Sequence, residues 1–223
     1  MAVIAALSLG ASPPPQAAAA GGDRTTTITL LKNGQLKLTA SPGTRNNILI
    51  YNLGANFIQI HDMAGLPLEA KVPMPAWWTI RGGNVFQANT YGIRGIVVFA
   101  GDQNDRVVNE SRLPSGLYGG SGDDQLEAGS EEDQLLGGAG MDRLYAKGPA
   151  GDVLNGGPDN DGLYGGEGPD WLKGGTGTDV ADGKGGTDEC EAEHEIYCEA
   201  ELRLIPRPNP IPTPDIPFTR SPD

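Results

Sequence analysis

Between Gly119 and Glu191 the sequence repeats a nine-residue unit in which aspartate always occupies the sixth position. An ionised aspartate supplies hard carboxylate oxygens, which are ligands that Ca²⁺ prefers in proteins. Zn²⁺ prefers nitrogen and sulfur, and Mg²⁺ demands a tighter octahedron than flexible loops provide. The spacing therefore predicts a row of calcium ligands, which are Asp124, Asp133, Asp142, Asp152, Asp161, Asp170, Asp179 and Asp188.

Glycine is the commonest residue in the turns that precede these aspartates. Glycine adopts positive φ without strain, and its missing Cβ lets backbone carbonyl oxygens crowd toward an ion. Where Asp159 replaces a glycine, aspartate tolerates the same left-handed geometry. The predicted turn residues of the metal sites are Gly119, Gly120, Gly122, Gly137, Gly138, Gly140, Gly156, Gly157, Asp159, Gly165, Gly166, Gly168, Gly174, Gly175 and Gly177.

The eighth position of each unit is apolar, and it is usually leucine. A flexible acidic linker, the other interpretation of a Gly- and Asp-rich segment, needs no apolar residue at every ninth place. We therefore expect short strands whose apolar side chains point inward, at Leu126, Leu135, Leu144, Leu154, Leu163, Leu172, Ala181 and Cys190. One extra residue, Ala146, interrupts the frame, and a weaker copy upstream contains Asp105 and Val107.

The units resemble the haemolysin-type, or RTX, calcium-binding repeat, whose pattern is G-G-x-G-x-D-x-U-x with U apolar. Units that begin at Gly119, Gly137, Gly165 and Gly174 match this pattern in full. The resemblance implies a parallel β-roll, in which two units form one coil and Ca²⁺ lies between successive turns on each edge. It says little about the first hundred residues.

Neighbouring units of such a roll lie on opposite edges, so the eight units divide into two sets. The set ending at Asp124, Asp142, Asp161 and Asp179 keeps nearly all of its glycines, whereas the other set departs from the pattern in three of its four turns. Four turns leave three gaps on each edge. We expect about three good sites on the first edge and one to three poor ones on the second, or about four to six calcium ions in total.

The charge of the chain is concentrated in the repeats. The whole chain has a formal net charge of −13, and residues 119–201 alone contribute −17. A nucleic-acid backbone or an anionic lipid surface would be repelled by this field, so neither is an expected partner. Carboxylates at a strand spacing of ~4.8 Å would also repel one another, so folding of the repeats is expected to require Ca²⁺.

The sequence predicts an all-β protein in five parts. Residues 1–20 form an apolar, Ala-rich leader typical of a signal peptide, which predicts export and a secreted, extracellular protein. Residues 25–100 contain hairpin patterns around Asn33-Gly34 and Gly54 and predict a small β-rich N-terminal domain or cap. Residues 101–191 form the β-roll, residues 192–201 a C-terminal cap, and residues 202–223 an extended Pro-rich tail without fixed packing. No membrane span is expected in the mature chain.

Two cysteines, Cys190 and Cys198, follow the last turn. In an exported protein a disulfide that closes the open end of the roll is favoured, because Cys190 occupies an inward position. Free buried thiols remain an alternative. A zinc site that includes His194 is a further one, although it offers only three soft ligands.

No enzymatic motif is present in the sequence. It lacks an HExxH helix and a complete GxSxG elbow, and its only histidines are His61 and His194. We therefore expect a non-enzymatic, monomeric calcium-binding module, with an envelope or extracellular glycan or protein as a possible partner. Two alternatives stay open: a calcium-dependent enzyme acting on glycans through residues 25–100, and an adhesin that uses Tyr145 and Tyr164 on the outer face of the roll.

Overall fold

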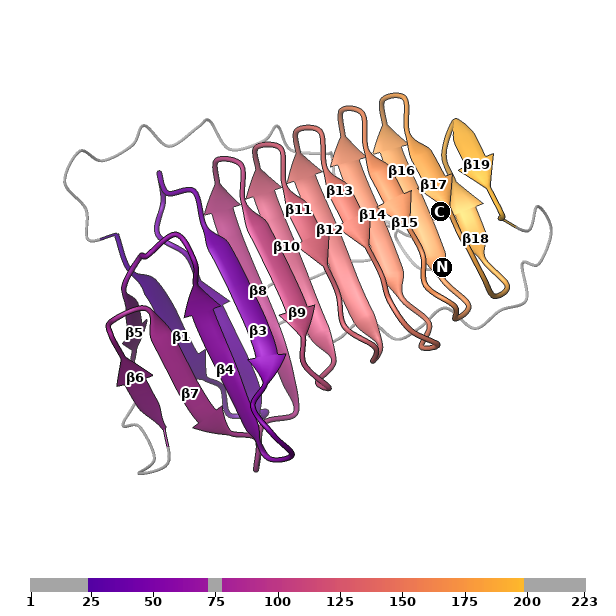
Figure 1. Ribbon diagram of the computed structural model, residues 1–223. Helices are drawn as coiled ribbons and strands as arrows, with labels where there is room; N and C mark the ends of the chain where they lie inside the picture. The colour runs from indigo at the N-terminus through magenta and orange to yellow at the C-terminus, as the bar shows by residue number, and fades with distance from the viewer. Residues whose placement is uncertain (1–23, 72–77, 199–223) are drawn as a thin grey trace, which may run out of the picture.

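The computed structural model describes residues 24–71 and 78–198, which form two β-sheets and no helix. The predicted leader, Trp77, the last residues of the predicted C-terminal cap and the Pro-rich tail lie outside the described residues. Figure 1 shows the strands stacked side by side along one axis, with the two sheets on opposite sides of a flattened coil.

Each sheet is continuous from one end of the described structure to the other. Sheet A contains, in spatial order, β18 (Glu189–Glu191), β16 (Trp171–Thr176), β14 (Val153–Pro158), β12 (Asp133–Ala139), β10 (Ser115–Ser121), β8 (Gly95–Asp102), β2 (Gln35–Thr39), β1 (Thr26–Leu30) and β5 (Leu68–Ala70). Sheet B contains β19 (His194–Ile196), β17 (Val180–Asp182), β15 (Gly162–Tyr164), β13 (Arg143–Tyr145), β11 (Gln125–Glu127), β9 (Arg106–Glu110), β3 (Asn47–Asn52), β4 (Phe57–Asp62), β7 (Val85–Asn89) and β6 (Thr79–Arg81).

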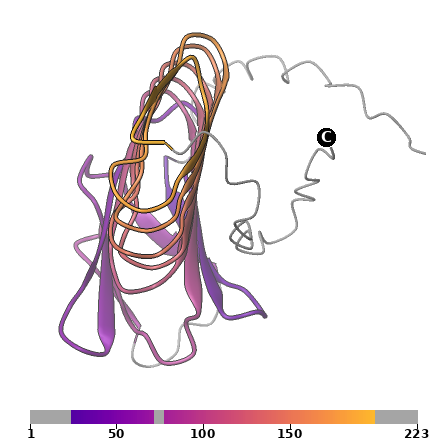
Figure 2. The ribbon, with the colours of Figure 1, turned by 90° about the vertical axis from the view of Figure 1, so that its right-hand side faces the viewer.

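From β8 onward the chain alternates between the two sheets, and every strand pairs in parallel with the strand two places later in the chain. Seen along the axis, successive coils lie over one another as flattened loops (Figure 2). The predicted parallel β-roll is therefore confirmed.

One row of inward side chains runs through each sheet of the roll. Leu117, Leu135, Leu154 and Leu172 are neighbours in sheet A and are all fully buried, as are Leu126, Leu144 and Leu163 in sheet B. The apolar eighth position thus supplies the core, because alternate residues of a strand face opposite sides of a sheet. Ala146, the extra residue, is 1% exposed and lies in the same core, so the turn absorbs the insertion without shifting the strands.

The described strands within residues 25–100 extend the two sheets of the roll. The hairpin expected at Asn33-Gly34 pairs β1 with β2, and the turn at Gly54 pairs β3 with β4, both antiparallel. Strands β2 and β3 then pair in parallel with β8 and β9 of the roll. Their buried side chains, which include Ile28, Leu36, Ile48 and Phe86, belong to the same core cluster as the leucines of the repeats.

Among the described residues there is no helix long and apolar enough to cross a membrane.

Candidate metal centre

On one edge of the roll, which we call edge one, the repeat aspartates form a continuous hydrogen-bonded row. The backbone N–H of each aspartate donates to Oδ1 of the aspartate in the next coil, at 2.7 to 2.9 Å. The row contains Asp105, Asp124, Asp142, Asp161 and Asp179. Every coil therefore places its carboxylate in register with the next one.

The other edge, edge two, contains an equivalent row. Here Ser115 N–H donates to Asp133, and the same N–H to Oδ1 bonds join Asp133 to Asp152, Asp152 to Asp170, and Asp170 to Asp188 at 2.7 to 2.9 Å. The eight units thus alternate between the two edges, as expected for two units per coil.

The second carboxylate oxygen differs between the two edges only in part. Among the described residues, Oδ2 of Asp124, Asp142, Asp161 and Asp179 on edge one is buried and has no hydrogen-bond partner, and none of these residues is more than 4% exposed. On edge two the same holds for Oδ2 of Asp152, whereas Oδ2 of Asp133 and of Asp170 accepts a hydrogen bond. A buried acceptor without a donor is unfavourable, and more so when it is charged. A cation is the partner that such an oxygen lacks, so the residues of edge one fit a row of metal ions.

The turn glycines let oxygens from two coils approach one another. A Cβ placed on Gly119 would lie within 3.0 Å of both Asp124 Oδ2 and the carbonyl oxygen of Gly137, one coil further on. A Cβ on Gly165 would lie 2.6 Å from Asp170 Oδ2 and 2.6 Å from the Gly183 carbonyl oxygen. The carboxylate of one turn and a carbonyl of the next therefore point to the same small volume, as oxygen ligation of Ca²⁺ requires.

Positive φ is needed at the second and fourth places of the edge-one turns. Gly138 and Gly140 have φ of 115° and 119°, and Asp159 adopts the expected left-handed conformation with φ of 81°. A side chain at Gly138 would meet the carbonyl oxygen of Gly120 at a distance that real Cβ atoms do not show. Glycine at this place is therefore a requirement of the stacked coils.

Edge two is less regular. Oδ2 of Asp133 accepts a bond from Gly129 N–H at 3.0 Å, and Oδ2 of Asp170 accepts one from Gly166 N–H at 2.5 Å. A metal ion bound to either Oδ2 atom would have to displace the N–H donor or share the oxygen with it. In the last turn Lys184 holds φ of 62°, a conformation that side chains rarely adopt.

Burial raises the pKa of most of these carboxyl groups above the ordinary aspartate value of 3.8. The largest cause is loss of solvation, and neighbouring carboxylates raise the pKa of several further. The pKa rises to about 7 for Asp124, Asp133, Asp142 and Asp161, and to about 9 for Asp152. Without a cation, the negative charges of the rows are therefore disfavoured.

The structure extends edge one beyond the repeats. Asn46 N–H donates to Asp105 Oδ1 at 2.6 Å, and Asp179 N–H donates to Glu193 Oε2 at 2.9 Å, so these two residues end the row. Asp105 and Asp124 also line a cavity of about 440 Å³. The weak copy at Asp105 and Val107 pointed to this coil, but nothing in the spacing indicated Asn46, which lies 59 residues earlier.

Other candidate ligands are not brought together. Among the described residues no group of three or more His, Cys, Asp or Glu is arranged to hold a metal ion, so a site between the coils would need backbone carbonyl oxygens as additional ligands. His61 Nε2 lies 3.0 Å from Asn84 Nδ2. Cys190 and Cys198 form a disulfide in the structure, with the Cα atoms 5.8 Å apart, and so offer no thiolate for zinc.

The comparisons with known proteins agree with the repeats. The family model of the RTX calcium-binding nonapeptide repeat, which comprises four copies, matches residues 117–148, 150–170 and 155–190. No curated protein and no solved structure matched the chain. The matched segment coincides with the coils whose aspartates form the two rows. Residues 117–190 are therefore RTX calcium-binding nonapeptide repeats, folded as a β-roll.

Proposed function

We propose that this chain is an exported module whose β-roll folds when it binds Ca²⁺ and then acts as a structural or binding element. The observation that supports it most directly is the row of buried Oδ2 atoms without hydrogen-bond partners on edge one. Each lies beside a glycine whose missing side chain leaves room for an ion. Calcium satisfies such oxygens and neutralises their charge in one step.

The proposed ligands are the repeat aspartates and the carbonyl oxygens of the turns between them. Edge one contributes Asp124, Asp142, Asp161 and Asp179, and we assign the stronger sites to it because their Oδ2 atoms have no competing donor. Edge two contributes weaker sites, because Asp133 and Asp170 already accept bonds from their own turns. Three gaps on edge one and one to three on edge two give about four to six ions.

Coupling of folding to metal binding follows from the charge. Residues 119–201 have a formal net charge of −17, and burial raises the pKa of Asp142 and Asp152 to about 7 and about 9. At neutral pH a metal-free roll would have to bury these groups either as unpaired anions or as protonated acids. Ions that bind only the folded chain stabilise it by mass action, and several sites of moderate affinity together rival the stability of a domain.

Export and a non-enzymatic role complete the proposal. RTX repeats are typical of secreted bacterial proteins, and a disulfide between Cys190 and Cys198 is suited to an oxidising compartment. The repeat carboxylates act as metal ligands in this proposal, so they are not available as general acids or bases.

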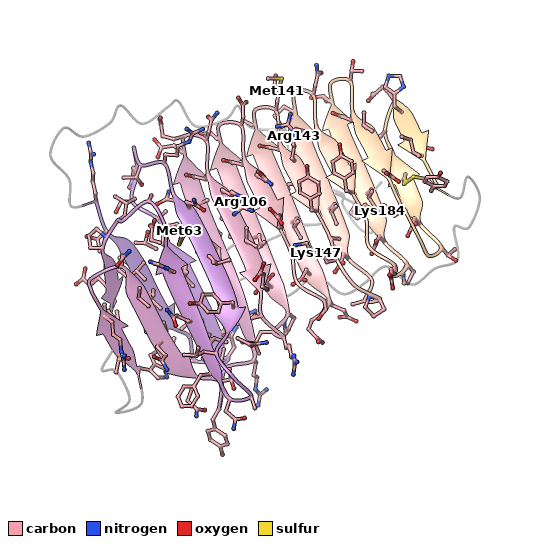
Figure 3. The ribbon with its side chains drawn as sticks, viewed as in Figure 1. Met63, Arg106, Met141, Arg143, Lys147 and Lys184 are labelled. Carbon is pink, nitrogen blue, oxygen red and sulfur yellow. A yellow bond between two sulfur atoms is a disulfide. The ribbon has the colours of Figure 1, made fainter. Side chains whose placement is uncertain are left out.

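One surface supports the alternative of an adhesin. Tyr145 and Tyr164 stack on the outside of sheet B with ring centroids 4.8 Å apart, and Lys184 Nζ lies 5.8 Å from the Tyr164 ring. Arg106 and Arg143 project from β9 and β13 of the same sheet (Figure 3). The tyrosine stack also has a purely structural explanation, because aromatic pairs on neighbouring strands stabilise a sheet. Calcium-dependent glycan binding that disappears when both tyrosines become alanine would favour the adhesin.

Circular dichroism during a calcium titration tests the coupling. We expect the β signal of the chelator-treated chain at pH 8 to be smaller than that of the calcium-bound chain and to rise with added Ca²⁺, with isothermal calorimetry giving about four to six ions per chain. Mg²⁺ at the same concentration serves as the control and should not produce the transition. The same β content in chelator and in calcium at this pH would overturn the proposal.

A further inference from the structure

The outward surface of sheet A is more apolar than that of sheet B along the same coils. In β9, β11 and β13 of sheet B, the paired outward positions are Arg106, Val108, Gln125, Glu127, Arg143 and Tyr145, of which four are polar or charged. In β8 to β16 of sheet A, two outward rows run across neighbouring strands. One contains Val97, Gly116, Gln134, Val153 and Trp171, and the other Phe99, Tyr118, Leu136, Asn155 and Lys173. We call their apolar members, Val97, Phe99, Tyr118, Leu136, Val153 and Trp171, the outer strip.

The outer strip is unusually buried for residues that point away from the core. Val97 is 0% exposed, Tyr118 is 8% exposed and Val153 is 9% exposed, although the inward positions of the same strands belong to Ile96, Leu117 and Leu154. The Tyr118 hydroxyl is also buried and has no hydrogen-bond partner within residues 24–71 and 78–198. A binding partner for this face must therefore supply both apolar surface and a hydrogen-bond acceptor.

The aromatic residues of the strip narrow the chemistry of that partner. Phe99 and Tyr118 stack with ring centroids 4.8 Å apart, and Trp171 lies three strands beyond Tyr118. Aromatic-lined surfaces are the usual binding sites of polyproline II segments. Such a segment presents proline rings to the aromatic rings, and its backbone carbonyls are free to accept bonds because it makes no internal ones.

The chain itself contains a segment of this chemistry. Beyond Cys198 the sequence continues for 25 residues, with proline at 206, 208, 210, 212 and 214, and with Ile205, Ile211, Ile216 and Phe218 among them. This segment leaves the roll at Cys198, which the disulfide joins to Cys190 in β18, the last strand of sheet A. Its starting point is therefore at the end of the sheet that carries the outer strip.

The segment is long enough to follow the strip. The distance from β18 to β8 is five strand spacings, or about 24 Å at ~4.8 Å per spacing. A polyproline II helix advances ~3.1 Å per residue, so 25 residues span up to about 75 Å. The segment can turn back at β18 and still cross every strand of the strip.

We propose that residues 202–218 bind the outer strip of the same chain as a polyproline II segment, with a backbone carbonyl accepting the hydrogen bond of the Tyr118 hydroxyl. This contact is independent of the calcium ligands, because the strip lies on the outside of sheet A and the aspartates lie on the two edges.

Photo-crosslinking in the full-length, calcium-loaded protein tests the contact. A benzophenone amino acid replaces Ile211, and mass spectrometry of an equal mixture of ¹⁵N-labelled and unlabelled chains identifies the crosslinked peptides. We expect crosslinks within one chain, to peptides of β10, β12 and β14. Crosslinks between labelled and unlabelled chains, crosslinks mainly to sheet B, or no crosslink to the roll would each overturn the proposal.

Two matched substitutions supply the control. Leu136→Gln removes a half-buried apolar side chain from the strip, whereas Val180→Gln makes a comparable change at an outward position of sheet B. We expect Leu136→Gln to reduce the crosslink yield roughly fivefold, the effect of losing part of one buried leucine, and Val180→Gln to leave it unchanged. Circular dichroism in calcium verifies that both variants fold. Equal yields from the two variants would contradict the assignment.

Discussion

Replacing Asp142 by asparagine separates the charge of an edge-one carboxylate from its hydrogen bond. Oδ1 of Asp142 accepts the Asp124 N–H at 2.8 Å, whereas Oδ2 is buried without a partner and the residue is 1% exposed. Asparagine can keep the bond to Oδ1, but it places an uncharged NH₂ group where the metal ligand should be. The variant should therefore weaken the calcium-bound roll and relieve the calcium-free one.

The two effects have different sizes. For a site with Kd near 10⁻⁴ M in ~1 mM free calcium, losing the ion costs about 1.4 kcal/mol of unfolding free energy. Without calcium, burial raises the pKa of Asp142 from 3.8 to about 7. That difference corresponds to roughly 4 kcal/mol well above pH 7, which is the upper limit of what the uncharged asparagine can recover.

Calorimetry and urea unfolding at pH 8, each with calcium and with chelator, measure both effects. We expect Asp142→Asn to bind one ion fewer, to lose about 1.4 kcal/mol in calcium, and to keep more β signal than the unsubstituted chain in chelator. Asp182→Asn is the matched control, because Asp182 is on the outer face of sheet B, where it accepts a bond from Lys184 N–H at 3.1 Å. If Asp142→Asn keeps the full number of ions and behaves like the control in both media, Asp142 is not a ligand.

Four further predictions use the same measurements. In chelator, burial raises the pKa of Asp124 and Asp161 from 3.8 to about 7, so the folded chain binds more protons than the unfolded chain between pH 4 and 7. The stability that these two groups contribute should therefore be full below pH 4 and lost as the pH rises through 7. A calcium-free β signal that grows with pH would contradict this sign. Asp133→Asn should reduce calcium binding less than Asp142→Asn, because Oδ2 of Asp133 already accepts the Gly129 N–H, and an equal loss in calorimetry would remove the ranking of the edges. Gly138→Ala should destabilise the calcium-bound roll by at least about 2 kcal/mol more than Gly101→Ala. Both glycines have positive φ, but only a Cβ at Gly138 would collide with a carbonyl oxygen. Equal urea midpoints of the two variants would argue against close approach of the coils. Reduction of the Cys190–Cys198 disulfide, which closes a short loop of sequence separation 8, should cost roughly 2 kcal/mol and leave calcium stoichiometry unchanged, as urea unfolding with and without reductant would report.

The sequence was sufficient to predict the roll because two independent periodic patterns coincide in it. The ninth-residue spacing of Leu126, Leu135 and Leu144 predicts which side chains are buried, and all three are fully buried. The same spacing predicts that Asp124 and Asp142 lie in adjacent coils of one edge, where the structure joins them by a hydrogen bond. Local turn chemistry was equally informative at Asn33-Gly34, which connects β1 to β2.

Long-range pairing in the first hundred residues was not predictable in the same way. Strand β2 pairs in parallel with β8, and Leu36 lies beside Ile96, yet nothing repeats between these two segments. Alternation of apolar residues indicates which face of a strand is buried but does not specify its partner. For this reason the sequence predicted a small β-rich domain or cap without specifying that its strands pair with both sheets of the roll. The outer strip was not predictable for a similar reason, because the residue type at the seventh and ninth positions of the repeat varies from unit to unit.

The distribution of apolar side chains along the roll predicts that bound ions matter most at its C-terminal end. Strands β2 and β3 each bury two large residues, Leu36 with Leu38 and Ile48 with Ile50, whereas β10 to β16 each bury one inward leucine. In the last coils even this leucine is replaced, by Ala181 in β17 and by Cys190 in β18. Apolar burial contributes roughly in proportion to the area removed from water, so its contribution falls along the chain while the number of buried carboxylates per coil stays constant. We therefore expect the N-terminal end to hold its fold by packing, and each later coil to depend more on the neutralising ion and, at the end, on the disulfide.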